Sequence, residues 1–283
     1  MQVPRPLRRR LLVLAAHPDD ETLGAGGILA SCAADGRVAV LILTDGVPVD
    51  PTHFAVSGRW SPDAYRQLRR HESLRALSAL GLDARFVFFG CIPDQQLAWH
   101  LKAGWNVLLS VVRQFRPQVL LAPAFEGGHP DHDAANFLAS RLQTSEGPDV
   151  WEYPLYTVRD GQPCHLRFRD LDSTVLNCEL DAELQTRKTA ALSCYASQAA
   201  TLAGLGSVAS ETIRPLPAHA YHQPALPEPA VYERWGWPIT AAAVARQFEA
   251  ALGSRWCGSH PRHPGRHLSA PCACSPPVTP WSP

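Results

Sequence analysis

Two short apolar runs in this chain each end in a segment rich in His and Asp, and this repeated pattern constrains the fold more than any other feature. The first run, 11–16, leads into His17–Thr22, whose order is His-Pro-Asp-Asp-Glu-Thr. The second run, 119–122, leads through a loop with Pro and Gly into His129–His132, whose order is His-Pro-Asp-His. Short apolar runs of this kind predict buried strands. Ionisable side chains at the end of a buried strand need counter-charges, hydrogen bonds or a metal.

The first half of the chain alternates between strand and helix patterns, which predicts an α/β fold. Strands are expected at 11–15, 38–43, 86–89 and 119–122, and helices at 22–34, 62–80, 101–115 and 133–142, with a long loop over 47–61. We therefore expect a doubly wound, mostly parallel, Rossmann-like sheet with helices on both faces. In the common strand order 3-2-1-4-5 the first and fourth strands are neighbours, and ligands bind beyond their carboxyl ends. Both His/Asp segments would then meet at one site.

The second half is less regular, and the C-terminal part is expected to be irregular. Strands are predicted at 151–158 and 174–178, a helix at 181–195, Pro-rich loops over 197–238 and a last helix at 239–252. Residues 1–253 are expected to form one domain. Residues 254–283 are rich in Pro, Ser, His and Cys without periodicity, which favours a disordered tail. The spacing of the Cys and His residues in this tail matches no standard zinc finger.

Composition excludes several classes of partner. Lys plus Arg and Asp plus Glu both number 26, so the chain has no charge excess that would favour nucleic acid or an anionic membrane. A small neutral or weakly charged molecule is the expected partner. The apolar run at 11–16 is too short for a secretory signal, and no run reaches transmembrane length. The eight cysteines are scattered, which favours free thiols in the cytoplasm. The oligomeric state is not indicated.

The first His/Asp segment offers ligands that suit zinc. His17 and Asp20 present an imidazole nitrogen and a carboxylate oxygen, while Asp19 between them can point elsewhere and act on a water molecule. A simpler interpretation makes each His-Pro-Asp a turn with a capping Asp. Two such segments after two predicted strands make that interpretation much less favourable than for either segment alone.

With these residues in view, the chain resembles the PIG-L/LmbE-like family of zinc-dependent deacetylases, which remove the acetyl group from N-acetylglucosamine-type sugars. Segments 16–21 and 129–132 are similar to the two family signatures, and the similarity extends over most of 11–252. Weaker family marks are found at Thr44–Gly46, Arg69–Glu72, Pro93–Asp94 and Lys188–Gln198. The two signatures together are quite specific, whereas the other marks alone are weak.

The resemblance implies a role for each site residue. The metal ligands would be His17, Asp20 and His132, and they would hold Zn²⁺, with Fe²⁺ or another divalent metal possible. The catalytic residues would be Asp19 as general base, His129 as oxyanion stabiliser or acid, and Asp131, which would orient His129. Arg69 and Asp94 would contact the substrate. Some relatives have a Tyr two residues before the His at position 129, where this chain has Gly127.

The implied reaction is hydrolysis of an acetamide, which needs three kinds of help. A metal lowers the pKa of a bound water from near 16 towards roughly 7, and two His and one carboxylate leave a zinc position open for it. Asp19 would take the proton as the water attacks. His129, if protonated, would meet the developing oxyanion, and Asp131 would raise the pKa of His129.

Several alternatives remain open at this point. The same residues would serve a zinc amidase that acts on a thiol or other non-sugar conjugate. A nucleotide-binding Rossmann module would use the Gly-rich segment 23–27, although the preceding carboxylates would repel a pyrophosphate. Two His and one carboxylate also suit Fe(II) oxygen chemistry, and a structural metal site would need a fourth ligand. Trp235 and Trp237 are expected to anchor a loop in the core.

Overall fold

The computed structural model describes residues 4–33, 36–50, 60–143, 147–170, 172–204 and 208–254. Its strands are β1 (Leu11–Ala15), β2 (Val38–Pro48), β3 (Val87–Asp94), β4 (Val119–Pro123), β5 (Asp149–Tyr153), β6 (Tyr156–Arg159), β7 (Gln162–His165), β8 (Leu176–Glu179) and β9 (Ser210–Pro215). The helices are α1 (Asp20–Cys32), α2 (Pro62–Ala79), α3 (Leu101–Phe115), α4 (Pro130–Ser140), α5 (Ala182–Leu192), α6 (Ala199–Leu202), α7 (Val231–Arg234) and α8 (Ala241–Leu252). Single turns of 3₁₀ helix are η1 (Arg5–Arg8), η4 (Ala84–Phe86), η5 (Leu97–Trp99) and η6 (Ala196–Gln198).

Within the described ranges, seven strands form one sheet in the order β3-β2-β1-β4-β5-β9-β8, and β6 and β7 form a separate hairpin. Strand β1 pairs in parallel with both β2 and β4, which confirms the expected order of the first four strands. Strand β5 continues the parallel part, and β9 and β8 complete the sheet in antiparallel pairing. The fold is therefore the expected α/β sheet with an antiparallel extension.

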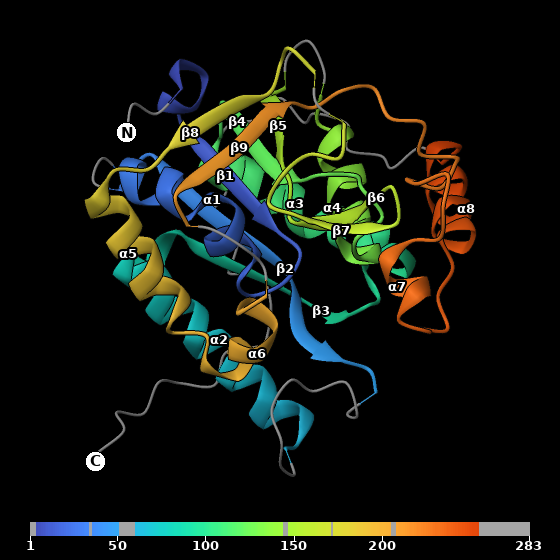
Figure 1. Cartoon of the computed structure of the whole chain (residues 1–283), viewed down its shortest axis with the longest axis horizontal. Coiled ribbons are helices and arrows are strands. Elements are labelled where there is room, and N and C mark those ends of the chain that lie inside the picture. The colour runs from blue at the N-terminus through green and yellow to red at the C-terminus, as the bar shows by residue number, and fades with distance from the viewer. Residues whose placement is uncertain are drawn as a thin grey trace, which may run out of the picture.

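Helices cover both faces of the sheet (Figure 1), as the strand–helix alternation predicted. Side chains alternate between the faces along a strand, so Leu12 and Leu14 of β1 pack into one core cluster and Leu11 and Val13 into another. The first cluster includes residues of α3, α4 and α8, and the second includes residues of α1, α2 and α5. Because both faces are buried, β1 and β4 are apolar along their whole length.

The structure corrects several predicted boundaries. Helix α1 begins at Asp20 and α4 at Pro130, two and three residues earlier than expected, because the His/Asp segments themselves form the first helical turns. The predicted strand 151–158 is two strands, β5 and β6. Strand β9 lies inside 197–238, which was expected to be loops. The predicted tail, from residue 255 onward, and positions 51–59 of the predicted loop lie outside the described residues.

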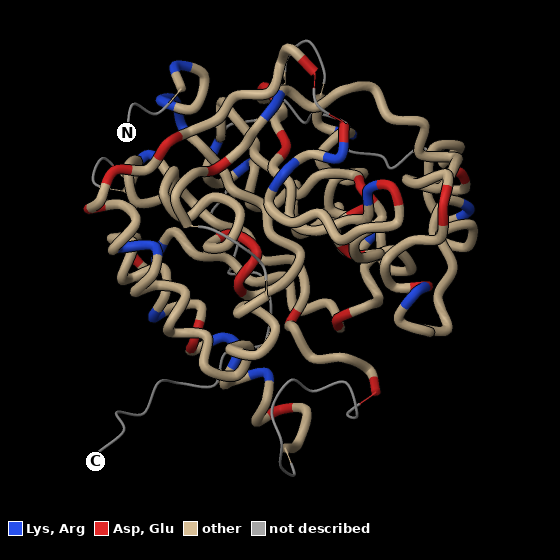
Figure 2. The backbone as a smooth tube through the Cα atoms, in the orientation of Figure 1, with Lys and Arg blue, Asp and Glu red and all other residues tan. Residues whose placement is uncertain are grey.

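Lys and Arg are interspersed with Asp and Glu along the chain in Figure 2. Among the residues that the structure describes, none of the helices combines the length and the apolar character that crossing a bilayer requires. The cysteines in these ranges are free thiols, namely Cys32, Cys91, Cys164, Cys178 and Cys194.

Candidate metal centre and active site

The two His/Asp segments meet at the carboxyl ends of β1 and β4. Each segment leaves a central strand and enters a helix, α1 or α4, so both turns lie at the edge where ligands bind in sheets of this type. His129 is the N-cap of α4, and Pro130 occupies the first helical turn, where its missing N–H costs no hydrogen bond. The local sequence thus places His and Asp side chains from two distant segments in one space.

Three of these side chains form a compact buried group. His17, Asp20 and His132 each offer a ligand atom, and these atoms lie within 4.8 Å of one another. The two carboxylate oxygens of Asp20 lie 3.3 Å from His17 Nδ1 and 3.2 Å from His132 Nε2. The Nε2 atom of His132 is buried and has no hydrogen-bond partner among the described residues. A buried nitrogen without a partner, facing a shared carboxylate, fits a divalent metal held by two imidazoles and one carboxylate.

The far side of the His17 ring faces two further carboxylates. His17 Nε2 lies 3.1 Å from Asp94 Oδ1 and 3.3 Å from Asp131 Oδ2. The Asp131 carboxylate also accepts hydrogen bonds from the backbone N–H groups of Gln95 and Leu97, at 2.6 and 2.9 Å. A carboxylate on the outer nitrogen of a His ligand fixes the orientation of the ring. His17, Asp94, His129 and Asp131 form a second group with ligand atoms this close, and it shares His17 with the first.

The hydrogen bonds of His129 differ from those expected from the sequence. We expected the Asp131 carboxylate to orient His129 and raise its pKa, but that carboxylate lies against His17 instead. Only the backbone N–H of Asp131 reaches His129, donating to Nδ1 at 3.1 Å. Burial, together with nearby His17 and His132, holds the pKa of His129 well below its usual value. The ring is therefore neutral with its proton on Nε2, which makes Nε2–H a hydrogen-bond donor.

Asp19 is held in a backbone conformation that favours glycine. Its φ is 121° and its ψ is −29°, a strained geometry of the kind that accumulates at functional sites. Its N–H donates to Glu21 Oε2 at 3.2 Å, and Glu21 Oε1 accepts a 2.5 Å bond from the Tyr195 hydroxyl. Burial raises the pKa of Asp19 to about 6, although Arg69 beside it acts in the opposite direction. The result is a constrained carboxyl next to the metal group but outside it.

A cavity of about 330 Å³ opens onto this group. Asp19, Arg69, Asp94 and His129 line it, so the residues expected to act on substrate face one space. Arg69 Nη2 donates to the Pro18 carbonyl at 2.6 Å and to Asp19 Oδ2 at 3.2 Å, while its buried Nε and Nη1 have no hydrogen-bond partner among the described residues. Arg69 therefore holds the Asp19 carboxylate in a fixed position.

The cavity also contains residues that sequence reasoning did not assign to it. Trp235 and Trp237 were expected in the core, but both line the cavity, and Trp235 is 53% exposed. Tyr156 from β6 and Gln198 from η6 line it as well. The Trp-Gly-Trp spacing was visible in the sequence, but no local pattern distinguishes a buried Trp from one at the mouth of a cavity.

The remaining family marks brace the site from outside. Ser197 donates from its N–H and its hydroxyl to the two carboxylate oxygens of Glu72, at 2.8 and 2.6 Å, which ties η6 to α2. Lys188 of α5 forms a buried ion pair with Glu211 of β9 at 2.7 Å. The first contact joins the C-terminal part to α2, which carries Arg69, and the second holds α5 against β9.

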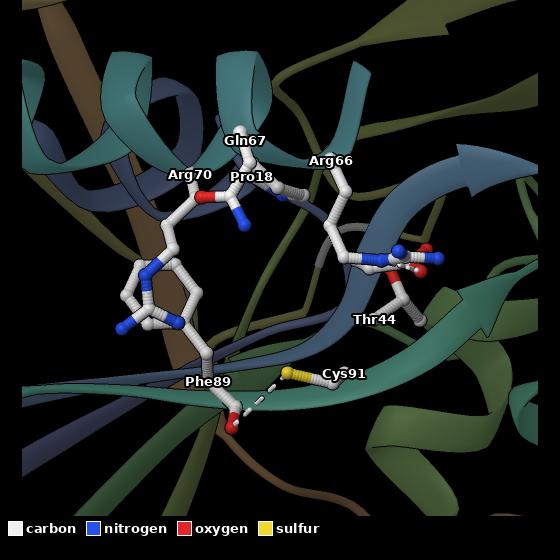
Figure 3. Close-up of a pocket in the computed structure, with 8 residues that line it drawn as sticks. Pro18, Thr44, Arg66, Gln67, Arg70, Phe89 and Cys91 are labelled. Atoms are coloured by element: carbon white, nitrogen blue, oxygen red, sulfur yellow. Dashed lines mark hydrogen bonds and ion pairs between the residues drawn. The ribbon is translucent and has the colours of Figure 1, made fainter. Parts of the chain in front are cut away.

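A much smaller cavity lies between α2 and the strands β2 and β3 (Figure 3). Its volume of about 20 Å³ has room for a water molecule at most. Asp45 lines this smaller cavity and accepts a 2.8 Å bond from Arg66, so Asp45 stands apart from the metal group. None of the His residues of the candidate site lines this cavity, whereas His17 and His129 line the larger one, which is the candidate substrate site.

The Gly-rich segment of α1 serves packing rather than phosphate binding. A Cβ at Gly24 would collide with the ring of Tyr153, and one at Gly27 would collide with the side chain of Leu180. The glycines let α1 approach the β5 strand and the β8 end closely, and the helix begins with carboxylates instead of free backbone donors. A nucleotide-binding module would need free backbone N–H groups and no carboxylates at this helix N-terminus, because these N–H groups contact the phosphates.

The fold and site define an α/β domain with a candidate metal centre at the switch point of a parallel sheet. Residues 12–142 match the model of the PIG-L family, described as GlcNAc-PI de-N-acetylase. This match confirms, over residues 12–142, the resemblance seen in the motifs.

Relatives of known name support the same assignment. The 1D-myo-inositol 2-acetamido-2-deoxy-alpha-D-glucopyranoside deacetylase of Nocardioides sp. is 34% identical over 163 residues, which cover 47% of this chain and 53% of that protein. The protein of the same name from Rhodococcus jostii is 36% identical over 175 residues, covering 51% and 59%. The chain thus spans about half the length of the curated relatives it matches.

Solved structures show the same fold at lower identity. The A40926 pseudoaglycone deacetylase superposes with a TM-score of 0.56 at 21% identity, covering 75% of this chain and all of that one. The N,N′-diacetylchitobiose deacetylase of Pyrococcus horikoshii superposes with a TM-score of 0.54 at 17% identity, covering 76% and 86%. About three quarters of the chain therefore share their fold with these solved structures.

Proposed function

We propose that this chain is a metal-dependent N-deacetylase that hydrolyses the acetamide of an N-acetylglucosamine-type sugar or sugar conjugate. The observation that carries the proposal is the convergence of His17, Asp20 and His132 beside a strained carboxyl that is not part of the group, Asp19. The relatives named as deacetylases of an acetamido sugar support the substrate class. Zinc is the proposed metal, since two imidazoles and one carboxylate are a common catalytic zinc set.

The metal, held by His17, Asp20 and His132, would supply a polarised carbonyl and an acidified water. Asp19 then takes the proton of the attacking water, because its carboxyl faces the cavity and Arg69 holds it in place. When the C–N bond breaks, Asp19 returns that proton to the leaving nitrogen. The products are a free amine and acetic acid, which releases its remaining proton to solvent and leaves as acetate, so protons and bonds balance.

His129 stabilises the charge that develops on the carbonyl oxygen. Its neutral ring keeps the proton on Nε2, because Nδ1 already accepts the Asp131 N–H. A neutral imidazole that donates from a fixed position stabilises an oxyanion without a prior change in protonation. Asp94 lies 3.6 Å from the same Nε2 and lines the cavity, where it would accept a hydrogen bond from a sugar hydroxyl.

The test is the release of free amine by zinc-loaded protein from a panel of N-acetylated sugars, sugar conjugates and amides of thiol conjugates. Asp19→Asn should keep its zinc and lose at least about a hundredfold in kcat, since it removes the base and no ligand. His132→Ala should lower the zinc content measured by elemental analysis. Near-normal turnover by Asp19→Asn, or cleavage of the thiol-conjugate amides alone, would contradict the proposal.

A further inference from the structure

A second sizeable cavity lies apart from the candidate active site and has no task in the reaction above. Its volume is about 210 Å³, and the described residues that line it have no member in common with those that line the larger cavity. We propose that this second cavity binds a small aliphatic carboxylate, held by the Arg169 guanidinium and the Glu126 carboxyl group. The inference goes beyond the proposed function and does not depend on it.

The second cavity is built from segments that are distant in the sequence. Glu126 comes from the loop after β4, Arg169 from the segment before β8 and Arg214 from β9, and residues between 218 and 226 complete the lining. His129, three residues after Glu126, lines the larger cavity instead. One short loop therefore contributes to two separate cavities.

Glu126 is a buried polar group of this lining, and it is 6% exposed. Its N–H donates to Asp133 Oδ1 at 3.1 Å and its carbonyl accepts a 2.5 Å bond from the Thr157 hydroxyl, so its backbone is held in place. Its Oε1 accepts the Arg169 N–H at 2.8 Å, whereas its buried Oε2 has no hydrogen-bond partner among the described residues. Because a buried polar atom without a partner is destabilising, a ligand in the cavity that bonds to Oε2 is favoured.

The protonation state of Glu126 makes Oε2 a donor. Burial raises the pKa of Glu126 to about 8, so the carboxyl group holds a proton at neutral pH. Glu152 of β5 and Asp133 of α4 also raise this pKa, whereas the Arg169 N–H and the Arg214 side chain of β9 lower it. Since Oε1 already accepts a hydrogen bond, the proton lies on Oε2. The ligand must therefore bring an acceptor.

Arg169 is the cation of this lining whose charge is least compensated. Its Nη2 lies 3.8 Å from Glu228 Oε1, which is its closest carboxylate contact among the described residues, and Glu228 also accepts a 2.6 Å bond from Arg234. Arg214, in contrast, donates from Nε to Glu152 Oε1 at 2.7 Å. An anionic ligand supplies Arg169 with the charge-assisted hydrogen bonds that Arg214 already has.

The other ionisable groups of the lining do not oppose an anion. His219 Nε2 lies 3.1 Å from Glu152 Oε2, so this ring is engaged by a carboxylate of the protein. Asp170 is exposed, and water and salt screen its charge. A cation in the same space would meet the guanidinium groups of Arg169 and Arg214. The charges therefore favour an anion over a cation.

The apolar part of the lining favours a carboxylate with a short hydrocarbon chain. Phe125, Pro224 and Leu226 line the cavity together with three alanines. A planar carboxylate pairs one oxygen with Arg169 and the other with Glu126 Oε2, while its chain lies against these apolar side chains. Inorganic phosphate would place additional oxygens against apolar groups that offer them no donor.

The experiment measures binding of butyrate, butyramide and inorganic phosphate by ligand-observed NMR titration. Butyramide has the shape of butyrate without its charge. Each titration uses zinc-loaded protein and is repeated with metal-free protein, which separates this site from binding to the metal. The variants are Arg169→Gln, Glu126→Gln and the matched control Arg167→Gln, because Arg167 is exposed, lies two residues from Arg169 and does not line the cavity.

Wild-type protein should bind butyrate at least about tenfold more tightly than butyramide or phosphate, with or without zinc, since a hydrogen-bonded charge is worth about this factor. Arg169→Gln should weaken butyrate binding by a similar factor, and Arg167→Gln should leave it unchanged. Between pH 7 and pH 9 the protonated fraction of Glu126 falls about tenfold, so wild-type affinity should fall about tenfold as well. Glu126→Gln should escape this loss, because its amide donates at both pH values.

The comparison of the three probes on the wild type needs no variant and already tests the ligand class. Equal binding of butyramide or phosphate, or no binding of any probe, would overturn the proposal. So would butyrate binding that requires zinc, an equal loss in Arg167→Gln and Arg169→Gln, or a pH dependence that Glu126→Gln retains.

Discussion

Replacing Lys188 by Met should destabilise the protein by about 3–5 kcal/mol, because it removes one partner of a buried ion pair. Lys188 Nζ lies 2.7 Å from Glu211 Oε1, and both side chains are 1% exposed. At an effective dielectric constant of about 20, charges this close attract by roughly 6 kcal/mol. Part of that attraction offsets the cost of taking Lys188 out of water, which leaves the smaller figure.

Glu211, the partner of Lys188, also caps part of helix α1, so loss of the Lys188 charge affects this helix as well. Helix α1 is kinked at Ala25, whose φ is −141°, so the helix restarts after it. Glu211 accepts the N–H groups of Gly27 and Ile28 at 2.6 and 2.9 Å and thereby caps the second segment. Without Lys188 this cap would be a buried charge with backbone donors alone to compensate it.

The assay is urea unfolding, with thermal unfolding as a second measure. A loss of 3–5 kcal/mol corresponds to a fall in Tm of roughly 6–20 °C for a domain of this size. Lys188→Met combined with Glu211→Gln should be less destabilised than the sum of the single variants. Arg9→Met is the control, because Arg9 pairs with Asp149 at a similar 2.8 Å on the exposed surface and should cost less than about 1 kcal/mol. A cost below 1 kcal/mol for Lys188→Met, or strict additivity, would refute the reasoning.

Two further predictions concern other buried carboxyls. Burial raises the pKa of Glu126 from the ordinary value of 4.5 to about 8. The folded protein therefore holds a proton that the unfolded chain has already released, and the free energy of unfolding falls as the pH rises between these two pKa values. Glu126→Gln should therefore gain up to about 4 kcal/mol relative to wild type between pH 4 and pH 9 in urea unfolding; a constant difference would contradict the assignment. Tyr195→Phe removes the 2.5 Å bond to Glu21 and should cost about 1–3 kcal/mol. It should also lower kcat at unchanged zinc content, since Glu21 holds the Asp19 turn; a variant equal to wild type in both would count against that role.

The parts of the fold that follow from local pattern could be predicted from the sequence. The strands and helices that form follow from the apolar runs of β1 and β4 and from the alternation of strand and helix patterns. Because connections between parallel strands are right-handed, few strand orders are then possible. Strand β9 was missed because its pattern, Ser210–Pro215, is short, has charged residues at Glu211 and Arg214, and ends in Pro. Both charges pair with residues far away in the chain, Glu211 with Lys188 and Arg214 with Glu152.

The sequence by itself determined which side chains gather at the site, because the carboxyl ends of neighbouring parallel strands must share one edge of the sheet. Only the tertiary structure decided how those side chains are paired. Asp131 lies against His17 rather than His129, since the loop after β3 supplies the two N–H groups that hold its carboxylate there. Likewise, Trp235 lies at the mouth of the cavity because α7 is tied to the loop before His129, and no spacing within the Trp-Gly-Trp segment encodes that contact.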